Sequence, residues 1–257
     1  MRRLHLVELE DLAWWPAVVR DLATDYLRFM ETKFALHRPV VPLLEEALRE
    51  SGATRLVDLC SGGAGPVVSL VAELRARGLA VTAVLTDKFP NVGAFADVAG
   101  ASGGAIAFER IPVDAQAVPA RLTGFRTIFN SFHHFSPNAA TAVLRDAVMA
   151  RQPIGVFEIP ERSLANLVPF LFTPLFVFAV TPFIRPFRWQ RLLWTYLLPL
   201  VPLTCWWDGL VSQLRAYHPE ELEALAVRLA PVHRWRAGRV PVGHVPGHLT
   251  YLIGLPQ

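Results

Sequence analysis

Cysteine is scarce in this sequence. Only two cysteines occur among 257 residues, Cys60 in a glycine-rich turn and Cys205 in an apolar segment. Because the two lie far apart, the sequence indicates neither a disulfide framework nor the close spacing of metal ligands. We therefore expect two reduced thiols, as in a cytoplasmic protein.

Charge is also sparse and is not gathered into runs. Charged residues make up 18% of the chain, and the net charge of +3 comes partly from scattered arginines. Without a long Lys/Arg run that could follow a phosphate backbone, nucleic acid is not an expected partner. The opening residues, MRRLHLVELEDLAWW, have acidic side chains where a signal peptide would have its apolar stretch, so we expect no export.

Apolar residues are abundant, and their excess lies between residues 164 and 207. The uncharged stretch NLVPFLFTPLFVFAVTPFI, residues 166–184, has the length that spans a bilayer. However, Pro169, Pro174 and Pro182 each remove a backbone donor that lipid cannot replace. We therefore expect two broken helices that form a hairpin rather than a membrane span.

The rest of the chain alternates strand-like and helix-like stretches, which predicts an α/β fold. Residues 1–50 are expected to be helical, and five buried strands follow with helices between them. Two more helices and two closing strands come after the apolar segment. The expected strands are TRLVDLC, AVTAVLTD, AFERIPVD, FRTIFNSF, IGVFEIP, VHRWRAG and GHLTYLIGLP.

Acidic residues and glycines mark the ends of the first three strands. The first strand ends in VDLCSGGAG, which begins at residue 57, and the next two end at Asp87 and Asp114. Ligands of mostly parallel sheets bind at the carboxyl ends of the strands, and glycines let a ligand approach the backbone. A carboxylate at the end of the second strand can accept both hydroxyls of a ribose.

These motifs resemble those of the class I S-adenosylmethionine-dependent methyltransferases. The resemblance covers residues 52–160 and the order of elements after residue 208. It implies that the first motif holds the methionine part of the cofactor, that the second strand binds the ribose and that the third binds the adenine. The residues so implied are Asp58, Cys60, Ser61, Gly62, Gly63, Asp87, Lys88, Phe89, Asp114 and Ala115, with Asn130 at the end of the fourth strand.

The resemblance implies a Rossmann-like methyltransferase fold, with a mostly parallel seven-stranded sheet flanked by helices. We expect a helical cap over residues 1–50 and a methyltransferase domain over residues 51–257, with an apolar helical insert at 163–207 after the fifth strand. A nicotinamide-dinucleotide enzyme is the alternative, but Cys60 stands where its fingerprint requires a glycine. A protein of this fold that does not methylate, such as a membrane-associated scaffold, is the other alternative.

Two histidines follow the fourth strand, in FNSFHHFSP. Methyl transfer is an in-line displacement that needs an aligned acceptor and, in some cases, a base. Histidine titrates near neutral pH, so His133 and His134 are candidate general bases. The alternative is a structural role at the start of the next helix, which SPN indicates. We expect no metal, because adjacent histidines do not easily face one ion.

Four residues are candidate contacts to the acceptor. Glu158 ends the fifth strand, and Tyr26 lies on an amino-terminal helix that could cover the pocket. Arg215 and Tyr217 could bind a polar group of the acceptor. Each also has a structural alternative: a salt-bridged loop for Glu158, the core for Tyr26 and an exposed helix end for the other two.

The apolar hairpin could serve in several ways. Arg185, Arg188 and Arg191 lie beside Trp189 and Trp194, a combination typical of membrane interfaces. The hairpin could contact a membrane, line a pocket for an apolar acceptor, form a homodimer interface or be a self-buried lid. We favour a methyltransferase for a hydrophobic small molecule or a lipid-like acceptor. It would be cytoplasmic and could be peripheral to the inner face of the membrane.

Overall fold

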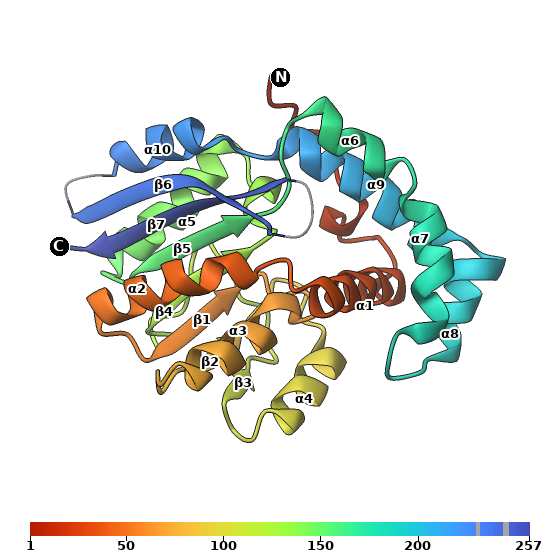
Figure 1. The fold of residues 1–257 in the computed structure, drawn as a ribbon, viewed down its shortest axis with the longest axis horizontal. Helices are drawn as coiled ribbons and strands as arrows, with labels where there is room; N and C mark the ends of the chain where they lie inside the picture. Colours follow the sequence, from red (N-terminus) through yellow and green to blue (C-terminus); the bar gives the residue numbers. More distant parts are fainter. Residues whose placement is uncertain (230–231, 244–246) are drawn as a thin grey trace.

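A seven-stranded sheet forms the centre of the molecule, in the order β3-β2-β1-β4-β5-β7-β6 (Figure 1). The computed structural model describes residues 1–229, 232–243 and 247–257. Strands β1 to β5 are parallel, whereas β7 is antiparallel to both β5 and β6. This confirms the expected mostly parallel sheet. The strands are β1 (Arg55–Leu59), β2 (Thr82–Leu85), β3 (Ile106–Phe108), β4 (Phe125–Phe129), β5 (Ile154–Glu158), β6 (His233–Pro241) and β7 (His248–Pro256).

Strands β3 and β4 end three or more residues earlier than the sequence predicts. Strand β3 ends at Phe108, and the IPVD sequence after it is not a strand. Pro112 has no N–H group to continue the ladder, so the chain turns toward the end of β2, where the Val113 N–H donates to the carbonyl of Asp87. Strand β4 ends at Phe129 because Asn130 adopts a positive φ of 48°.

Helices cover both faces of the sheet, and each face has its own apolar core. Helices α2 (Val41–Ser51), α3 (Gly65–Ala76) and α4 (Val92–Ala101) pack on one face. Helices α5 (Pro137–Met149) and α10 (Pro219–Val227) pack on the other. Strands β4 and β5 are buried along their whole length, as strands covered on both faces should be.

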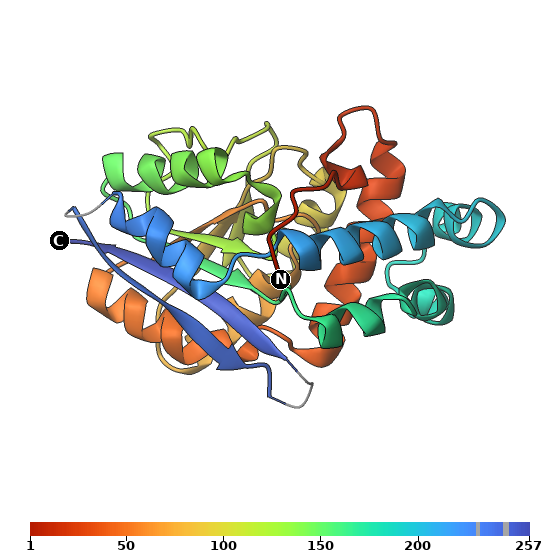
Figure 2. The ribbon, with the colours of Figure 1, turned by 90° about the horizontal axis from the view of Figure 1, so that it is seen from above.

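A third core lies beyond the carboxyl ends of the strands and is made by helices alone. Helix α1 (Ala17–Phe34) lies beside that edge of the sheet, α9 (Leu200–Arg215) packs against α1, and α7 (Thr173–Val180) packs against α9 (Figures 1 and 2). Buried apolar residues from all three helices form this core: Val19, Leu22, Ala23, Tyr26, Val177, Val201 and Cys205, with Ile184 from the loop after α7. The cap is thus joined to the apolar segment as well as to the sheet.

The apolar segment folds into short, bent helices. These are α6 (Leu164–Phe170), α7 (Thr173–Val180), the 3₁₀ turn η4 (Thr181–Phe183), α8 (Trp189–Leu192) and the π-helical turn η5 (Leu193–Leu197). Among the described residues no single helix is long and apolar enough to cross a membrane. One bent pair, Leu164–Phe170 with Thr173–Phe183, passes that test together and is bent by 42°.

The last helix of this region is longer than expected. Helix α9 (Leu200–Arg215) begins seven residues before WDGLVSQLRAY, where the sequence predicts a helix. Pro202 lies in its first turn, where a missing N–H breaks no helical hydrogen bond. The helix therefore passes through residue 207, where we expected the insert to end. Its Gly209 lies so close to Phe170 that an added Cβ would approach that ring to 2.6 Å.

Candidate active site

A cavity of about 800 Å³ opens at the carboxyl ends of β1, β2 and β4. Its other walls come from α1, α6, α7 and α9, so it lies between the sheet and the helical third core. This is where a parallel sheet is expected to bind its ligand, and the volume is within the range of small-molecule sites, roughly 300–1,000 Å³.

The glycine-rich turn after β1 forms the floor of the cavity. Cys60, Gly62 and Ala64 all have positive φ, at 60°, 51° and 66°. The Gly62 N–H donates to Oδ2 of Asp87 at 2.8 Å, which ties the turn to the end of β2. Cys60 thus has the backbone conformation of a glycine, and burial raises the pKa of its thiol well above its usual value.

Nearly all residues predicted to hold the cofactor line this cavity. They are Cys60, Ser61, Gly62, Gly63, Asp87, Lys88, Phe89, Asp114, Ala115 and Asn130. Asp58 is the exception, because its carboxylate is buried inside the sheet and accepts from the Thr127 hydroxyl at 2.7 Å. Burial raises the pKa of Asp58 to about 7. The prediction that Asp58 faces the ligand is therefore corrected: it supports the turn from below.

The chemistry of this half of the cavity fits S-adenosylmethionine. Each carboxylate oxygen of Asp87 accepts one backbone N–H, from Gly62 at 2.8 Å and from Phe89 at 2.7 Å, and each can accept another bond. Hydroxyls of a ribose could supply those bonds. The Phe89 ring offers an aromatic surface, and the Arg20 guanidinium of α1 lies 4.5 Å from its centroid.

His133 lines the cavity from the 3₁₀ turn η3 (Phe132–His134) and is fixed by Glu158. The distance from His133 Nδ1 to Glu158 Oε2 is 2.5 Å. Glu158 also accepts the backbone N–H groups of Ser131, Phe132 and His133, at 2.8, 2.8 and 3.3 Å. Burial would raise the pKa of Glu158, but His133 and these N–H groups hold it below its usual value. Glu158 therefore orients His133 and does not reach the cavity as an acceptor contact, which corrects that prediction.

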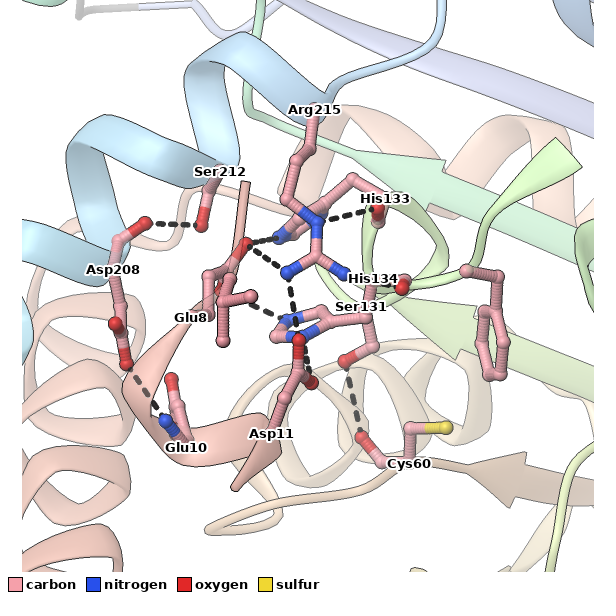
Figure 3. A network of polar contacts seen from close by, with 12 residues as sticks. Glu8, Glu10, Asp11, Cys60, Ser131, His133, His134, Asp208, Ser212 and Arg215 are labelled. Carbon is pink, nitrogen blue, oxygen red and sulfur yellow. Dashed lines mark hydrogen bonds and ion pairs between the residues drawn. The ribbon is translucent and has the colours of Figure 1, made fainter. Parts of the chain in front are cut away.

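His134 also lines the cavity, in different electrostatic surroundings (Figure 3). Its Nδ1 is 2.8 Å from Oδ1 of Asp11, and its Nε2 is 3.3 Å from Oε2 of Glu8. Burial lowers the pKa of His134, but the two carboxylates outweigh burial and raise it to about 10. At neutral pH His134 is therefore a cation and holds no free lone pair.

Arg215 and Tyr217 lie behind the cavity wall, which corrects their prediction as acceptor contacts. Arg215 Nη1 is 3.2 Å from Glu8 Oε1 and 2.7 Å from Asp11 Oδ2, and the side chain also donates to the carbonyls of His133 and His134 (Figure 3). The Tyr217 hydroxyl donates to the Phe135 carbonyl at 2.8 Å. Both side chains are buried. Their role here is to hold η3, which we call the histidine turn, in place.

The acidic partners come from a segment that the sequence did not single out. Residues 3–12, which we call the strap, cross from α9 to the histidine turn and include η1 (Leu9–Asp11). Asp208 of α9 accepts the N–H groups of Leu9 and Glu10, at 2.6 and 3.1 Å. Burial and the Asp208 charge raise the pKa of the Glu10 carboxyl to about 8, and burial raises that of Asp208 to about 7. No local pattern links the strap to residues 133 and 208, so only the folded chain reveals it.

Glu8 and the two histidines come close enough to suggest a metal site. Their ligand atoms lie within 4.8 Å of one another, although we expected no metal at the adjacent histidines. However, the Arg215 guanidinium contacts the same carboxylate, and a proton occupies His134 at neutral pH. The positive charge that Glu8 requires is thus supplied by the protein itself.

The remaining walls of the cavity come from the helices and include a group of apolar residues. Tyr26 lines this half and also belongs to the third core, and burial raises the pKa of its hydroxyl above the usual value. Ala23, Leu27, Met30, Pro169, Phe170, Phe176 and Cys205 line it too. The site therefore has a polar half at the strand ends and a helical half in which these apolar residues lie beside polar residues of α1 and α9, such as Arg28, Asp208 and Ser212.

Comparison with known proteins gives matches in structure but not in sequence. No known sequence family and no curated protein matches the chain. The plantazolicin methyltransferase BamL, solved with S-adenosylhomocysteine and an analogue of desmethyl-plantazolicin, aligns over 93% of this chain and 98% of its own, with 11% identity and a TM-score of 0.55. An O-methyltransferase family protein from Burkholderia thailandensis aligns over 91% of this chain, with 14% identity and a TM-score of 0.51.

These likenesses concern the fold. This chain spans 59% of the length of the Burkholderia protein, and the identities of 14% and 11% are too low to carry an activity across. The strand order, the glycine turn and the aligned structures agree, which confirms the expected fold. The chain has the fold of the class I S-adenosylmethionine-dependent methyltransferases.

Proposed function

We propose that the protein is an S-adenosylmethionine-dependent methyltransferase for a hydrophobic small molecule or a lipid-like acceptor. The observation that carries this proposal is the cavity itself, with polar strand ends on one side and, on the helical side, apolar residues of α1, α6 and α7 beside polar residues of the strap and α9. Bound S-adenosylmethionine would supply an electrophilic methyl group. The solved methyltransferases of the same fold support the proposal.

We assign the polar half to the cofactor. Asp87 would accept the ribose hydroxyls, Asp114 would accept the adenine amino group, and Phe89 would lie against the adenine ring. The turn Cys60–Gly63 would hold the methionine part, and Asn130 lies at the junction with the acceptor half. The two compartments would thus place donor and acceptor in line, which is the main requirement of a displacement reaction.

His133 is the better candidate for the general base. Glu158 would accept a proton from Nδ1, so that Nε2, which lies 3.7 Å from Glu8 Oε1, would take the proton of the acceptor, and His133 is a cavity residue. His134, whose raised pKa keeps it protonated, would instead stabilise negative charge near the acceptor. Tyr26 would contact the apolar body of the acceptor.

The hairpin at 163–207 would serve the same acceptor. It contributes apolar residues to the cavity and also exposes apolar side chains outside it. We therefore include peripheral membrane contact in the proposal, in preference to a homodimer interface.

Isothermal titration with S-adenosylmethionine tests the proposed cofactor site. We expect binding by the wild type and at least about tenfold weaker binding by Asp87→Ala, because hydrogen bonds to a charged group contribute about 1.5–3 kcal/mol. Asp97→Ala, an exposed carboxylate on α4, is the matched control and should bind as the wild type does. Absence of heat with the wild type, or unchanged binding by Asp87→Ala, would contradict the proposal.

Transfer of a radiolabelled methyl group to lipid extracts tests the reaction. Labelled product with the wild type supports methylation of an apolar acceptor. Cofactor binding without transfer to any lipid or apolar extract favours the alternative, a protein of this fold that does not methylate.

A further inference from the structure

The most unusual surface of the molecule is the outer face of the hairpin. Large apolar side chains are exposed along it, and Figures 1 and 2 show α7 and α8 at the end of the molecule opposite the C-terminus, with α6 between them and the sheet. The exposed residues are Leu164, Val168, Leu171, Phe172, Leu175, Phe176, Phe183, Phe187, Trp189, Leu192, Tyr196, Leu197 and Leu198. Contiguous apolar surface of this kind usually marks an interaction site.

The tip of the hairpin combines aromatic residues with positive charge. Phe187 and Trp189 are 63% and 62% exposed, and Arg185 is exposed beside them. No acidic residue occurs in the sequence between Glu161 and Asp208. Tryptophan and arginine beside an apolar surface are typical of the boundary between lipid headgroups and acyl chains.

The same helices connect this surface to the cavity. Pro169, Phe170 and Thr173 line the cavity from α6 and its junction with α7, whereas Leu171 and Leu175 of the same helices face outward. Phe176 lines the cavity and is 53% exposed, so it stands at the rim between the two. Phe176 is therefore a residue at which the outer surface meets the lining of the cavity.

We propose that the outer face of α6, α7 and α8 docks on an anionic lipid bilayer, from which the acceptor enters the cavity past Phe176. A second copy of the chain fits this surface less well. In a twofold contact through the tip, the exposed Arg185 would face its own copy, and the segment offers no carboxylate to balance it. Anionic headgroups supply the complementary charge.

This inference rests on the proposed function, since it concerns access to the acceptor half of the same site. Its test needs neither cofactor nor turnover. A negative result for membrane docking would therefore leave the proposed methyltransferase function untouched, and the reverse also holds. The full chain is mixed with vesicles of phosphatidylcholine alone, or of phosphatidylcholine with phosphatidylglycerol, and bound protein is measured by flotation. We expect binding to the anionic vesicles and much weaker binding to the neutral ones.

Variants at the tip locate the contact. Phe187→Ser combined with Trp189→Ser should weaken partitioning at least about tenfold, because two exposed aromatic side chains no longer enter the lipid. Arg185→Glu should weaken it about fivefold or more, and mainly on anionic vesicles. Met149→Ser and Ile111→Ser, which remove exposed apolar side chains outside the hairpin, should leave partitioning unchanged.

Two further measurements complete the experiment. Circular dichroism reports the folding of each variant, and light scattering reports whether the protein is a monomer or a dimer. Native circular dichroism of the variants shows that lost binding is not lost folding. Three results overturn the inference. The wild type does not bind anionic vesicles, or the tip variants bind them as well as the wild type does. The third result is a wild-type protein that forms a dimer and does not bind vesicles, while the tip variants are monomers.

Discussion

His133 and His134 are neighbours in the chain, but their surroundings give them different properties. His133 faces Glu158 from the sheet, which fixes its Nδ1. His134 faces Asp11 and Glu8 from the strap, and these carboxylates favour its charged form. Residue type alone could not separate the two, because the partners of His134 lie more than 120 positions away.

The charge on His134 should make stability depend on pH. Its pKa in the folded chain is raised to about 10, above the usual value of about 6.5. The stabilisation is therefore fully present below about pH 6.5 and is lost as the pH rises toward 10. We expect His134→Gln to lower the free energy of unfolding by about 2 kcal/mol at pH 6, with a difference that shrinks at higher pH.

Urea unfolding over a pH series measures this dependence. His248→Gln, at an exposed histidine on β7, is the control for loss of a ring at the surface. A deficit of His134→Gln that stayed constant from pH 6 to pH 10 would show that packing, and not charge, accounts for it.

Among the elements, α1 has contacts of two kinds. On one side it packs against the glycine turn, where a Cβ added to Gly63 would lie 2.8 Å from the Thr24 carbonyl oxygen. On the other side Asp25, fully buried, pairs with Arg191 of α8 at 2.6 Å. Helix α1 therefore joins the polar half of the site to the hairpin.

The first contact predicts that Gly63→Ala is costly for packing. The methyl group would push α1 away from the turn, and we expect a loss of about 1–3 kcal/mol in the free energy of unfolding. Gly65→Ala is the matched control, since its Cβ would meet only ordinary contacts at 3.8 Å. Thermal unfolding compares the two, and equal melting temperatures would refute the close approach.

The second contact predicts a strong effect of a single substitution and a weak effect of a double one. Asp25→Ala leaves the buried Arg191 without its carboxylate and should cost about 3–5 kcal/mol. Asp25→Leu combined with Arg191→Met removes both charges, and Arg28 and Arg188, which also contact Asp25, are partly exposed and can turn to water. We expect the double variant to recover most of the loss in denaturant unfolding. Equal losses in both variants would argue against a charge-pair mechanism.

At the scale of the whole molecule, the sequence predicted the sheet and one half of the site. The buried strands and the glycine turn were predicted because each is encoded by residues that are close together in the sequence. Asp58 was misplaced because its direction depends on the register that pairs it with Thr127 of β4. The strap was missed because its contacts to α9 and the histidine turn depend on tertiary folding alone.

The strap also bears on the order of folding. Glu8 is synthesised among the first residues, but its partner Arg215 comes 207 residues later. Contacts between such distant residues close a long loop, which slows their formation, and amino-terminal segments emerge from the ribosome first. Strands β1 to β5 can therefore pair before α9 is available to the strap, whereas β6 and β7 follow α9 in the chain. In a refolding experiment, the histidine turn should gain the strap carboxylates Glu8 and Asp11 after it gains Glu158 of β5.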